Sequence, residues 1–373
     1  MKEELKELTK ISRFYGNDPE FVIAGGGNTS FKNEDKLWVK ASGISMEDID
    51  EDGFVCLSRK ELKKISMKCY SQNSSEREAR VKKDLNEAIL FPTNKRPSVE
   101  TSMHEIIDFP FVVHTHPTLV NALMCSKNAK KIANKLFGTQ ALYVEYTNPG
   151  YVLFKKVEAE LIYFRAKQGK EPSIIFLENH GVFVGGNSTS EIMAAYEKVM
   201  KVLKGQVAVL LPENDELPSE DKVQELILSL KQHHDLKQFA ILFRNSELIQ
   251  YYLASKETFD KVNKPFTPDD IVYCKSKYLF VSNSLIEIVE GVKEFNIKNG
   301  YFPKVVAIEG IGLLAIEENA KSAQTVIDVF LNMMKVSFYS DSFGGPQFMN
   351  KEQIDFIDNW EVENYRRQVA KKS

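Results

Sequence analysis

The chain has 373 residues, of which 27% are charged and 43% hydrophobic, and its 49 basic and 52 acidic residues give a net charge of −3. That length can bury a large core and favours two domains, whereas the near-neutral charge gives no electrostatic reason to expect nucleic acid as a partner. Charges occupy the N-terminus where a signal peptide needs an apolar stretch, and no segment approaches a membrane-spanning length, so we expect a cytoplasmic protein without a membrane partner.

Helices are expected to alternate with strands through the first two hundred residues. The expected helices are Lys2–Tyr15, Arg59–Met67, Glu76–Leu90, one from Thr101, one after Pro117, Val152–Lys167 and Thr189–Leu210. The expected strands are Phe21–Ala24, Lys36–Lys40, Asp52–Leu57, a strand running into His114, Leu142–Tyr146 and Ser173–Leu177. This alternation predicts an α/β fold.

An acidic, proline-containing stretch that begins at Leu211 is poor in apolar residues and predicts a domain boundary. We therefore expect one domain over residues 1–212 and a smaller α/β domain over residues 222–373. Strands in the second domain are expected at Ile271–Cys274, Tyr278–Val281 and Val305–Ile308.

One segment of the second domain resembles a segment of the first. Residues 174–184 align without gaps with residues 305–315, and a long helix is expected after both. Glu178 matches Glu309 and Gly181 matches Gly312, but Ile311 stands where the first segment has His180. Two interpretations stay open: a degenerate repeat without metal ligands, or a chance likeness between two buried strands that end in glycine turns.

Three histidines and an acid are the candidate catalytic residues. His114 and His116 are two residues apart at the end of an expected strand, so both side chains can face one point. His180 follows another expected strand, where Gly181 permits a sharp turn, and Glu100 lies at an expected helix start. Each has an ordinary explanation alone, either as a core imidazole or as a first-turn acid. Together they are typical of a catalytic zinc site, or of a site for another divalent metal.

The glycine-rich turn at residues 25–27 is the candidate phosphate site, because its backbone N–H groups can approach an anion. Side-chain donors for the same anion are expected from Asn28, Thr29, Ser42 and Ser98. A flexible glycine-rich loop is the alternative explanation of this turn.

Four segments in order resemble the class II aldolase/adducin family, which includes zinc-dependent fuculose- and rhamnulose-phosphate aldolases and pentulose-phosphate 4-epimerases. They are Gly26–Ser30, Lys40–Gly43, Pro97–His104, and His114–His116 with Asn179–Gly181. The resemblance implies a three-layer α/β/α domain in which His114, His116 and His180 hold Zn²⁺. It also implies that Glu100 is the catalytic acid/base and binds the resting metal, and it adds Gly27 and Gly43 to the phosphate contacts.

The resemblance implies a lyase that acts on a small phosphorylated sugar. Such an enzyme cleaves a ketose 1-phosphate into dihydroxyacetone phosphate and an aldehyde through a metal-stabilised enediolate. The relatives are mostly tetramers, so we expect a homo-oligomer, and His104 is expected to supply a supporting hydrogen bond beside the metal. A pentulose-phosphate 4-epimerase, a sugar-phosphate dehydratase and a non-catalytic adducin-like protein remain as alternatives.

The sequence departs from the simpler members of that family at one position. Val99 stands where fuculose-type aldolases carry a second phosphate-binding serine, which leaves the identity of the sugar open. A longer subfamily, in which the aldolase is fused to a short-chain dehydrogenase, resembles this chain further, around Val305 and Trp360. This sequence ends at Ser373, so we expect any aldehyde oxidation or reduction to fall to another protein.

Overall fold

The computed structural model describes residues 2–209, 211, 220–233 and 236–360. The chain divides into two compact units, which we call unit 1 (Met1–Met124 and Asn128–Gln206) and unit 2 (Cys125–Lys127 and Val207–Ser373). The predicted boundary between residues 212 and 222 lies largely outside the described residues. Among the helices of the described part, none is both long enough and apolar enough to cross a membrane.

Unit 1 is built on a seven-stranded sheet in the order β3-β2-β1-β4-β7-β6-β5. The strands are β1 (Asn28–Lys32), β2 (Lys36–Lys40), β3 (Phe54–Ser58), β4 (Phe111–Thr115), β5 (Ala141–Val144), β6 (Ile174–Leu177) and β7 (Gly181–Gly186). The helices are α1 (Lys2–Gly16), α2 (Arg59–Met67), α3 (Ser74–Glu87), α4 (Thr101–Ile106), α5 (Thr118–Met124), α6 (Ala129–Phe137), α7 (Tyr151–Gln168) and α8 (Thr189–Lys204). Only the β5–β6 pair among these neighbours is parallel.

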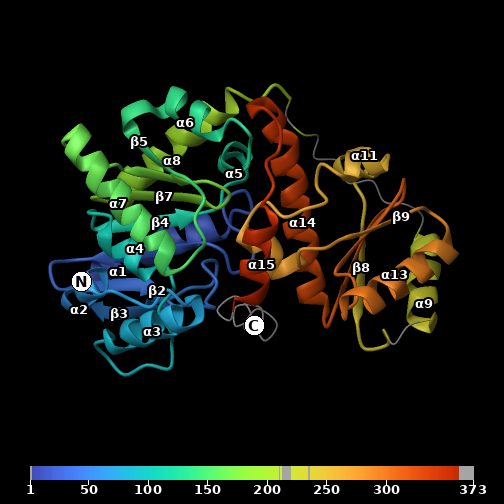
Figure 1. The fold of residues 1–373 in the computed structure, drawn as a ribbon, viewed down its shortest axis with the longest axis horizontal. Coiled ribbons are helices and arrows are strands. Elements are labelled where there is room, and N and C mark those ends of the chain that lie inside the picture. The colour runs from blue at the N-terminus through green and yellow to red at the C-terminus, as the bar shows by residue number, and fades with distance from the viewer. Residues whose placement is uncertain (1, 210, 212–219, 234–235, 361–373) are drawn as a thin grey trace. The chain divides into compact units, whose positions relative to one another are not determined.

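Helices cover both faces of this sheet because successive side chains along each strand point to opposite faces. On one face, Val112 and Phe183 pack into a buried cluster with residues of α4 and α7. On the other face, Thr115 Oγ1 donates a hydrogen bond of 2.7 Å to Tyr196 Oη of α8. The strands of unit 1 thus lie between two layers of helices, which confirms the expected α/β/α fold (Figure 1).

Unit 2 contains a four-stranded sheet in the order β8-β11-β10-β9. The strands are β8 (Ala240–Arg244), β9 (Leu279–Val281), β10 (Val305–Ile308) and β11 (Gly312–Glu317). The helices are α9 (Glu220–His233), α10 (Glu247–Leu253), α11 (Lys256–Phe259), α12 (Pro268–Cys274), α13 (Leu285–Asn299), α14 (Ala320–Ser340) and α15 (Lys351–Asn359). Leu230 of α9 and Val292 of α13 pack on Val306 and Leu314 of the sheet.

Two expected strands are wrong. Phe21–Ala24 forms turns, in which the N–H groups of Phe21 and Val22 donate to the carbonyl of Asp18. Ile271–Cys274 belongs to α12, whose first turn has a capping box between Thr267 and Asp270. The capping box favours a helix more strongly than the β-branched residues that follow it favour a strand.

Candidate metal centre

Three histidines from two neighbouring strands of unit 1 converge. His114 lies in β4, His116 follows that strand, and His180 lies in the turn between β6 and β7. The ring centroids lie 4.8 Å apart for His114 and His116, 5.0 Å for His114 and His180, and 5.3 Å for His116 and His180. One nitrogen atom of each ring lies within 4.8 Å of the other two. The antiparallel pairing of β4 with β7 brings the distant His180 to this place.

The orientation of His114 is fixed by its neighbours in β7. Its Nδ1 lies 3.0 Å from the carbonyl oxygen of Val182, and its ring stacks on Phe183 with centroids 4.1 Å apart. A carbonyl can only accept, so Nδ1 donates this hydrogen bond and Nε2 is the ring atom that faces the other candidate ligands. That Nε2 lies 3.0 Å from Nε2 of His116. Nitrogens that share a tetrahedral zinc at bond lengths of about 2.0–2.1 Å lie about 3.3 Å apart, so this spacing suits one ion.

Glu100 completes the cluster from the N-cap of α4. Its Oε1 lies 3.1 Å from Nε2 of His114 and 3.5 Å from Nε2 of His180. Burial raises the pKa of this carboxyl, but His114 and His180 lower it more, and the net pKa is well below the usual range. Burial also lowers the pKa of His180 to about 4, against the opposing effect of Glu100, which favours the neutral, metal-binding imidazole. The donor set therefore fits a divalent cation.

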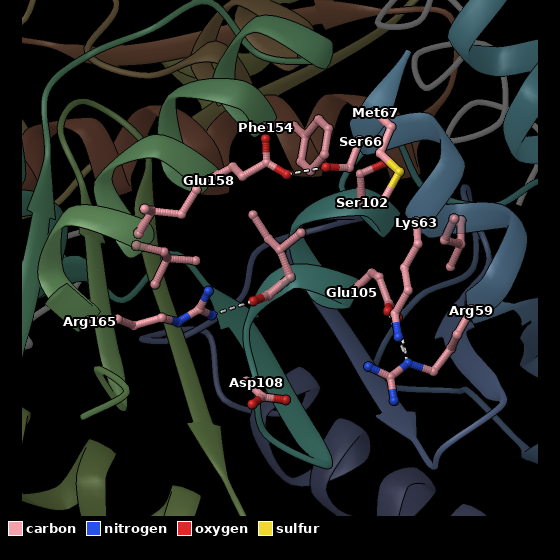
Figure 2. A pocket seen from close by; sticks show the side chains of 14 residues that line it. Arg59, Lys63, Ser66, Met67, Ser102, Glu105, Asp108, Phe154, Glu158 and Arg165 are labelled. Atoms are coloured by element: carbon pink, nitrogen blue, oxygen red, sulfur yellow. Dashed lines mark hydrogen bonds and ion pairs between the residues drawn. The ribbon is translucent and has the colours of Figure 1, made fainter. Parts of the chain in front are cut away.

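Buried contacts hold α4, and with it Glu100, in place. Lys32 Nζ donates to two carbonyl groups at the C-terminal end of α4, both at 2.5 Å, and Arg165 donates to a third at 2.7 Å. Arg59 pairs with Glu105 at 2.9 Å. Figure 2 shows Arg59, Glu105 and Arg165 at a pocket that is lined by residues of α2, α4 and α7. The pocket has a volume of about 440 Å³. Burial lowers the pKa of Lys32 to about 7, against the charge of Glu105.

His104 lies beside the cluster. Its Nδ1 makes a hydrogen bond of 2.7 Å with Ser30 Oγ, and its ring packs edge-on against Phe183. The expected supporting hydrogen bond is thus made to the β1 strand and not to a metal ligand. Burial lowers the pKa of His104 to about 3, and its Nε2 has no hydrogen-bond partner among the described residues.

The turn that carries His180 depends on two residues in different ways. Asn179, with φ of 51°, takes the left-handed conformation. Gly181 is required for space, because a Cβ there would lie 2.6 Å from Cδ2 of His116 and 2.6 Å from the carbonyl oxygen of Thr115. The expectation that Gly181 makes the sharp turn is corrected: Asn179 makes it, and Gly181 lets β7 approach the ligands.

The first group of phosphate candidates lies at the start of β1. Gly27 has φ of 72°, and a Cβ there would lie 3.0 Å from the carbonyl oxygen of His114. Asn28 pairs with His114 across the two strands. The Thr29 hydroxyl instead makes a 2.7 Å hydrogen bond with Ser12 of α1, so its side chain lies on the α1 face of the sheet. Strand alternation places the Asn28 side chain on the opposite face.

The second group of phosphate candidates comes from two loops that meet. Ser42 N–H donates to the carbonyl of Arg96 at 2.9 Å. An isolated antiparallel bridge between Ala41 and Pro97 lies next to this hydrogen bond. Gly43 has φ of 85°. Ser98 Oγ accepts the N–H of Glu100 at 3.2 Å, which links this loop to the start of α4.

Sequence reasoning did not identify Ser30, Lys32 or Phe183 as parts of the site. Ser30 ends the glycine-rich motif and so carried a signal, whereas the burial of Lys32 in β1 is visible only in the structure. The stacking of Phe183 and the carbonyl of Val182 follow from strand register, which has no local signature.

Comparison with known proteins places the first unit in a described family. Residues 6–207 match the Class II Aldolase and Adducin N-terminal domain.

The chain is 22% identical over 429 aligned positions to the uncharacterized oxidoreductase YuxG of Bacillus subtilis (strain 168), covering 98% of this chain and 58% of that protein. It is 24% identical over 217 positions to the L-fuculose phosphate aldolase of Methanocaldococcus jannaschii, covering 55% of this chain and 94% of that protein. The N-terminal class II aldolase domain of a conserved protein from Thermoplasma acidophilum aligns with a TM-score of 0.46 and 24% identity, over 54% of this chain and 92% of that one. The chain thus spans little more than half the length of the Bacillus relative.

Proposed function

The chain belongs to the class II aldolase and adducin family, and we propose that it is a zinc-dependent aldolase for a ketose 1-phosphate. The products are dihydroxyacetone phosphate and an aldehyde. The convergence of His114, His116 and His180 next to Glu100 carries this proposal. A rhamnulose- or fuculose-type phosphate is the proposed substrate, and the likeness to an L-fuculose phosphate aldolase supports it.

The three imidazoles and Glu100 would hold the metal. Three neutral nitrogen ligands leave coordination positions open, which is typical of catalytic rather than structural zinc. When bound there, a divalent cation supplies positive charge beside the sugar carbonyl and hydroxyl oxygens. Stabilisation of that kind contributes several kcal/mol to a step that develops negative charge.

Glu100 is the proposed proton carrier. A glutamate side chain is ionised at neutral pH, so the carboxylate, which lies 3.1 Å from Nε2 of His114, can accept a proton. In carbon–carbon bond formation, its carboxylate removes the proton from the carbon next to the ketone. In cleavage, its acid form returns a proton to the carbon that keeps the bonding electrons. Its location at the N-cap of the anchored α4 fixes the carboxylate beside the histidines.

The substrate phosphate is proposed to lie against the glycine-rich segment and the two adjoining loops. Backbone N–H groups and short polar side chains there suit a dianion. The proposed contacts are Gly27, Asn28, Thr29, Ser42, Gly43 and Ser98. The Thr29 hydroxyl is engaged with Ser12 and its N–H donates to Asn28 Oδ1 at 2.9 Å, so Thr29 would contribute by orienting the Asn28 side-chain amide.

The proposal extends to the organisation of the protein. Residues 1–212 form the catalytic domain, residues 222–373 form a second domain, and the enzyme works as a homo-oligomer. Sedimentation of the full chain tests the last point, because a monomer at assay concentration would contradict it.

Product analysis tests the proposed reaction. The purified, zinc-loaded protein is incubated separately with rhamnulose 1-phosphate, fuculose 1-phosphate and ribulose 5-phosphate. We expect dihydroxyacetone phosphate from at least one ketose 1-phosphate, and its loss in His116→Ala. His233→Ala is the matched control, because His233 is exposed on α9 and lies outside unit 1. Xylulose 5-phosphate from ribulose 5-phosphate without cleavage of either ketose 1-phosphate would indicate an epimerase instead.

A further inference from the structure

The sheet of unit 2 repeats four adjacent strands of unit 1. Unit 1 contains β4-β7-β6-β5 in that spatial order, and unit 2 contains β8-β11-β10-β9. In both series the first two pairs are antiparallel and the last pair is parallel. A helix follows the first strand of each series, α5 in unit 1 and α10 in unit 2, and a long helix follows the hairpin, α8 and α14.

The repetition extends to single residues. The hairpins β6–β7 and β10–β11 align without gaps, and the N-caps Ser188 and Asn319 of the following helices fall at matching positions. Asn179 and Gly310 match in the turns and have φ of 51° and 65°. Helices α7 and α13 both end at left-handed glycines, which also match in this gapless alignment.

Backbone hydrogen bonds repeat as well. In unit 1 the N–H of Asn179 donates to the carbonyl of Met124 at 3.1 Å, and in unit 2 the N–H of Gly310 donates to the carbonyl of Leu253 at 2.9 Å. Likewise, the N–H of Glu178 donates to the carbonyl of Val144 at 3.0 Å, and the N–H of Glu309 donates to the carbonyl of Val281 at 2.9 Å. The first pair ties the turn to the end of α5 or α10, and the second pair ties it to the end of β5 or β9. Chance likeness of two buried strands would not reproduce these longer-range contacts.

Strand register then identifies the counterparts of the metal ligands. His114 pairs with Phe183 in unit 1, and Phe243 pairs with Leu314, the counterpart of Phe183, in unit 2. Asn245 therefore corresponds to His116. In the hairpin turn, Ile311 corresponds to His180.

These three positions of unit 2 lie around the same hairpin turn, but none carries an imidazole, thiolate or carboxylate. A Cβ on Gly312 would lie 2.7 Å from the carbonyl oxygen of Arg244 and 2.4 Å from Cζ of Phe243. The aromatic ring thus fills the space beside the turn. Asn245 Oδ1 accepts from Gln250 Nε2 at 2.6 Å, and the same nitrogen lies 3.1 Å from the carbonyl oxygen of Ile311.

We propose that unit 2 contains a metal-free copy of residues 111–204, in which Phe243, Asn245 and Ile311 occupy a closed metal position. The inference rests on the proposed metal site of unit 1, because that site defines the three counterparts. It follows that each chain holds one catalytic metal ion. It follows further that the backbone of unit 2 still presents three side chains to one point, so imidazoles placed there would bind a transition metal ion.

Metal counting on designed variants tests this inference. The full chain and its F243H/N245H/I311H variant are loaded with Zn²⁺, dialysed and analysed by elemental mass spectrometry. We expect one zinc ion in the unchanged chain and two in the triple-histidine variant. When His116→Ala is added, we expect no ion in the otherwise unchanged chain and one ion in the triple-histidine variant. The matched control F243L/N245A/I311L repacks the same positions without ligands and should hold one ion.

The outcomes separate the two proposals. A folded triple-histidine variant that holds no more zinc than the unchanged chain would overturn the copy, whereas no zinc in the unchanged chain would overturn the site of unit 1. If the triple variant does not fold, N245H/I311H keeps the partly buried Phe243 and should add a weaker ion in a calorimetric Zn²⁺ titration. Failure of that folded variant to gain an ion would equally contradict the inference, whereas zinc retained by His116→Ala alone would count against the ligand assignment in unit 1.

Discussion

The replacement Gly181→Ala tests how tightly the fold presses β7 against the metal ligands. The new Cβ would lie 2.6 Å from Cδ2 of His116 and 2.6 Å from the carbonyl oxygen of Thr115. Carbon contacts are comfortable at about 3.3–4.0 Å, so roughly 0.7 Å or more of overlap must be relieved. Overpacking of this kind costs about 1–3 kcal/mol. The ring of His116 can move, but the carbonyl of Thr115 belongs to the paired backbone, so both the ligand and the β4–β7 pairing must shift.

The part of the strain that is relieved by displacing His116 from the metal lowers zinc affinity, by at most about 150-fold, since a factor of ten corresponds to about 1.4 kcal/mol. Competition with a chromophoric chelator measures this affinity, and urea unfolding of the metal-free protein measures any strain left in the fold. Gly205→Ala is the control, because the nearest atoms to its Cβ lie at 3.5 Å. If zinc affinity in Gly181→Ala equals that of the unchanged protein, β7 does not press on His116.

Three further predictions concern single side chains of the site. His116→Ala should lose bound zinc and turnover while its circular dichroism stays unchanged; full activity with zinc retained would remove His116 from the ligand set. Glu100→Gln should retain most of the metal but turn over about 10²-fold more slowly, because the amide cannot carry the proton, and an unchanged rate in a steady-state assay would reduce Glu100 to a structural role. His104 has a folded-state pKa of about 3, below its unfolded value, so its contribution to stability is complete above about pH 6.5 and is lost as the pH falls toward 3. When the pH falls from 7 to 5, this effect should lower the free energy of unfolding of the unchanged protein by about 2 kcal/mol, and His104→Gln should be spared that loss. Urea titrations at the two pH values measure the difference, and equal losses in both proteins would contradict a His104 pKa of about 3.

The parts of the fold that follow local rules could be predicted from the sequence. Arg59–Met67 is a helix with the predicted bounds, because its apolar spacing and Ser58 cap are local signals. The facing of His114 and His116 follows from the two-residue period of a strand. Glu100 was placed at a helix start by the residues around it.

Other parts depend on pairing between distant segments and could not be predicted. The approach of His180 to His114 needs the β4–β7 pairing, and the role of Gly181 as a spacer needs the position of His116. The same limit applies to the copy in unit 2. Its hairpin is visible in the sequence, but the match of Phe243 to His114 rests on register alone.

Anomalous X-ray diffraction from crystals of the zinc-loaded protein, collected at the zinc absorption edge, locates the metal ion itself. We expect one peak per chain, about 2.0–2.1 Å from one nitrogen of each of His114, His116 and His180. A peak bound by other residues, or no peak in crystals grown with zinc, would contradict it.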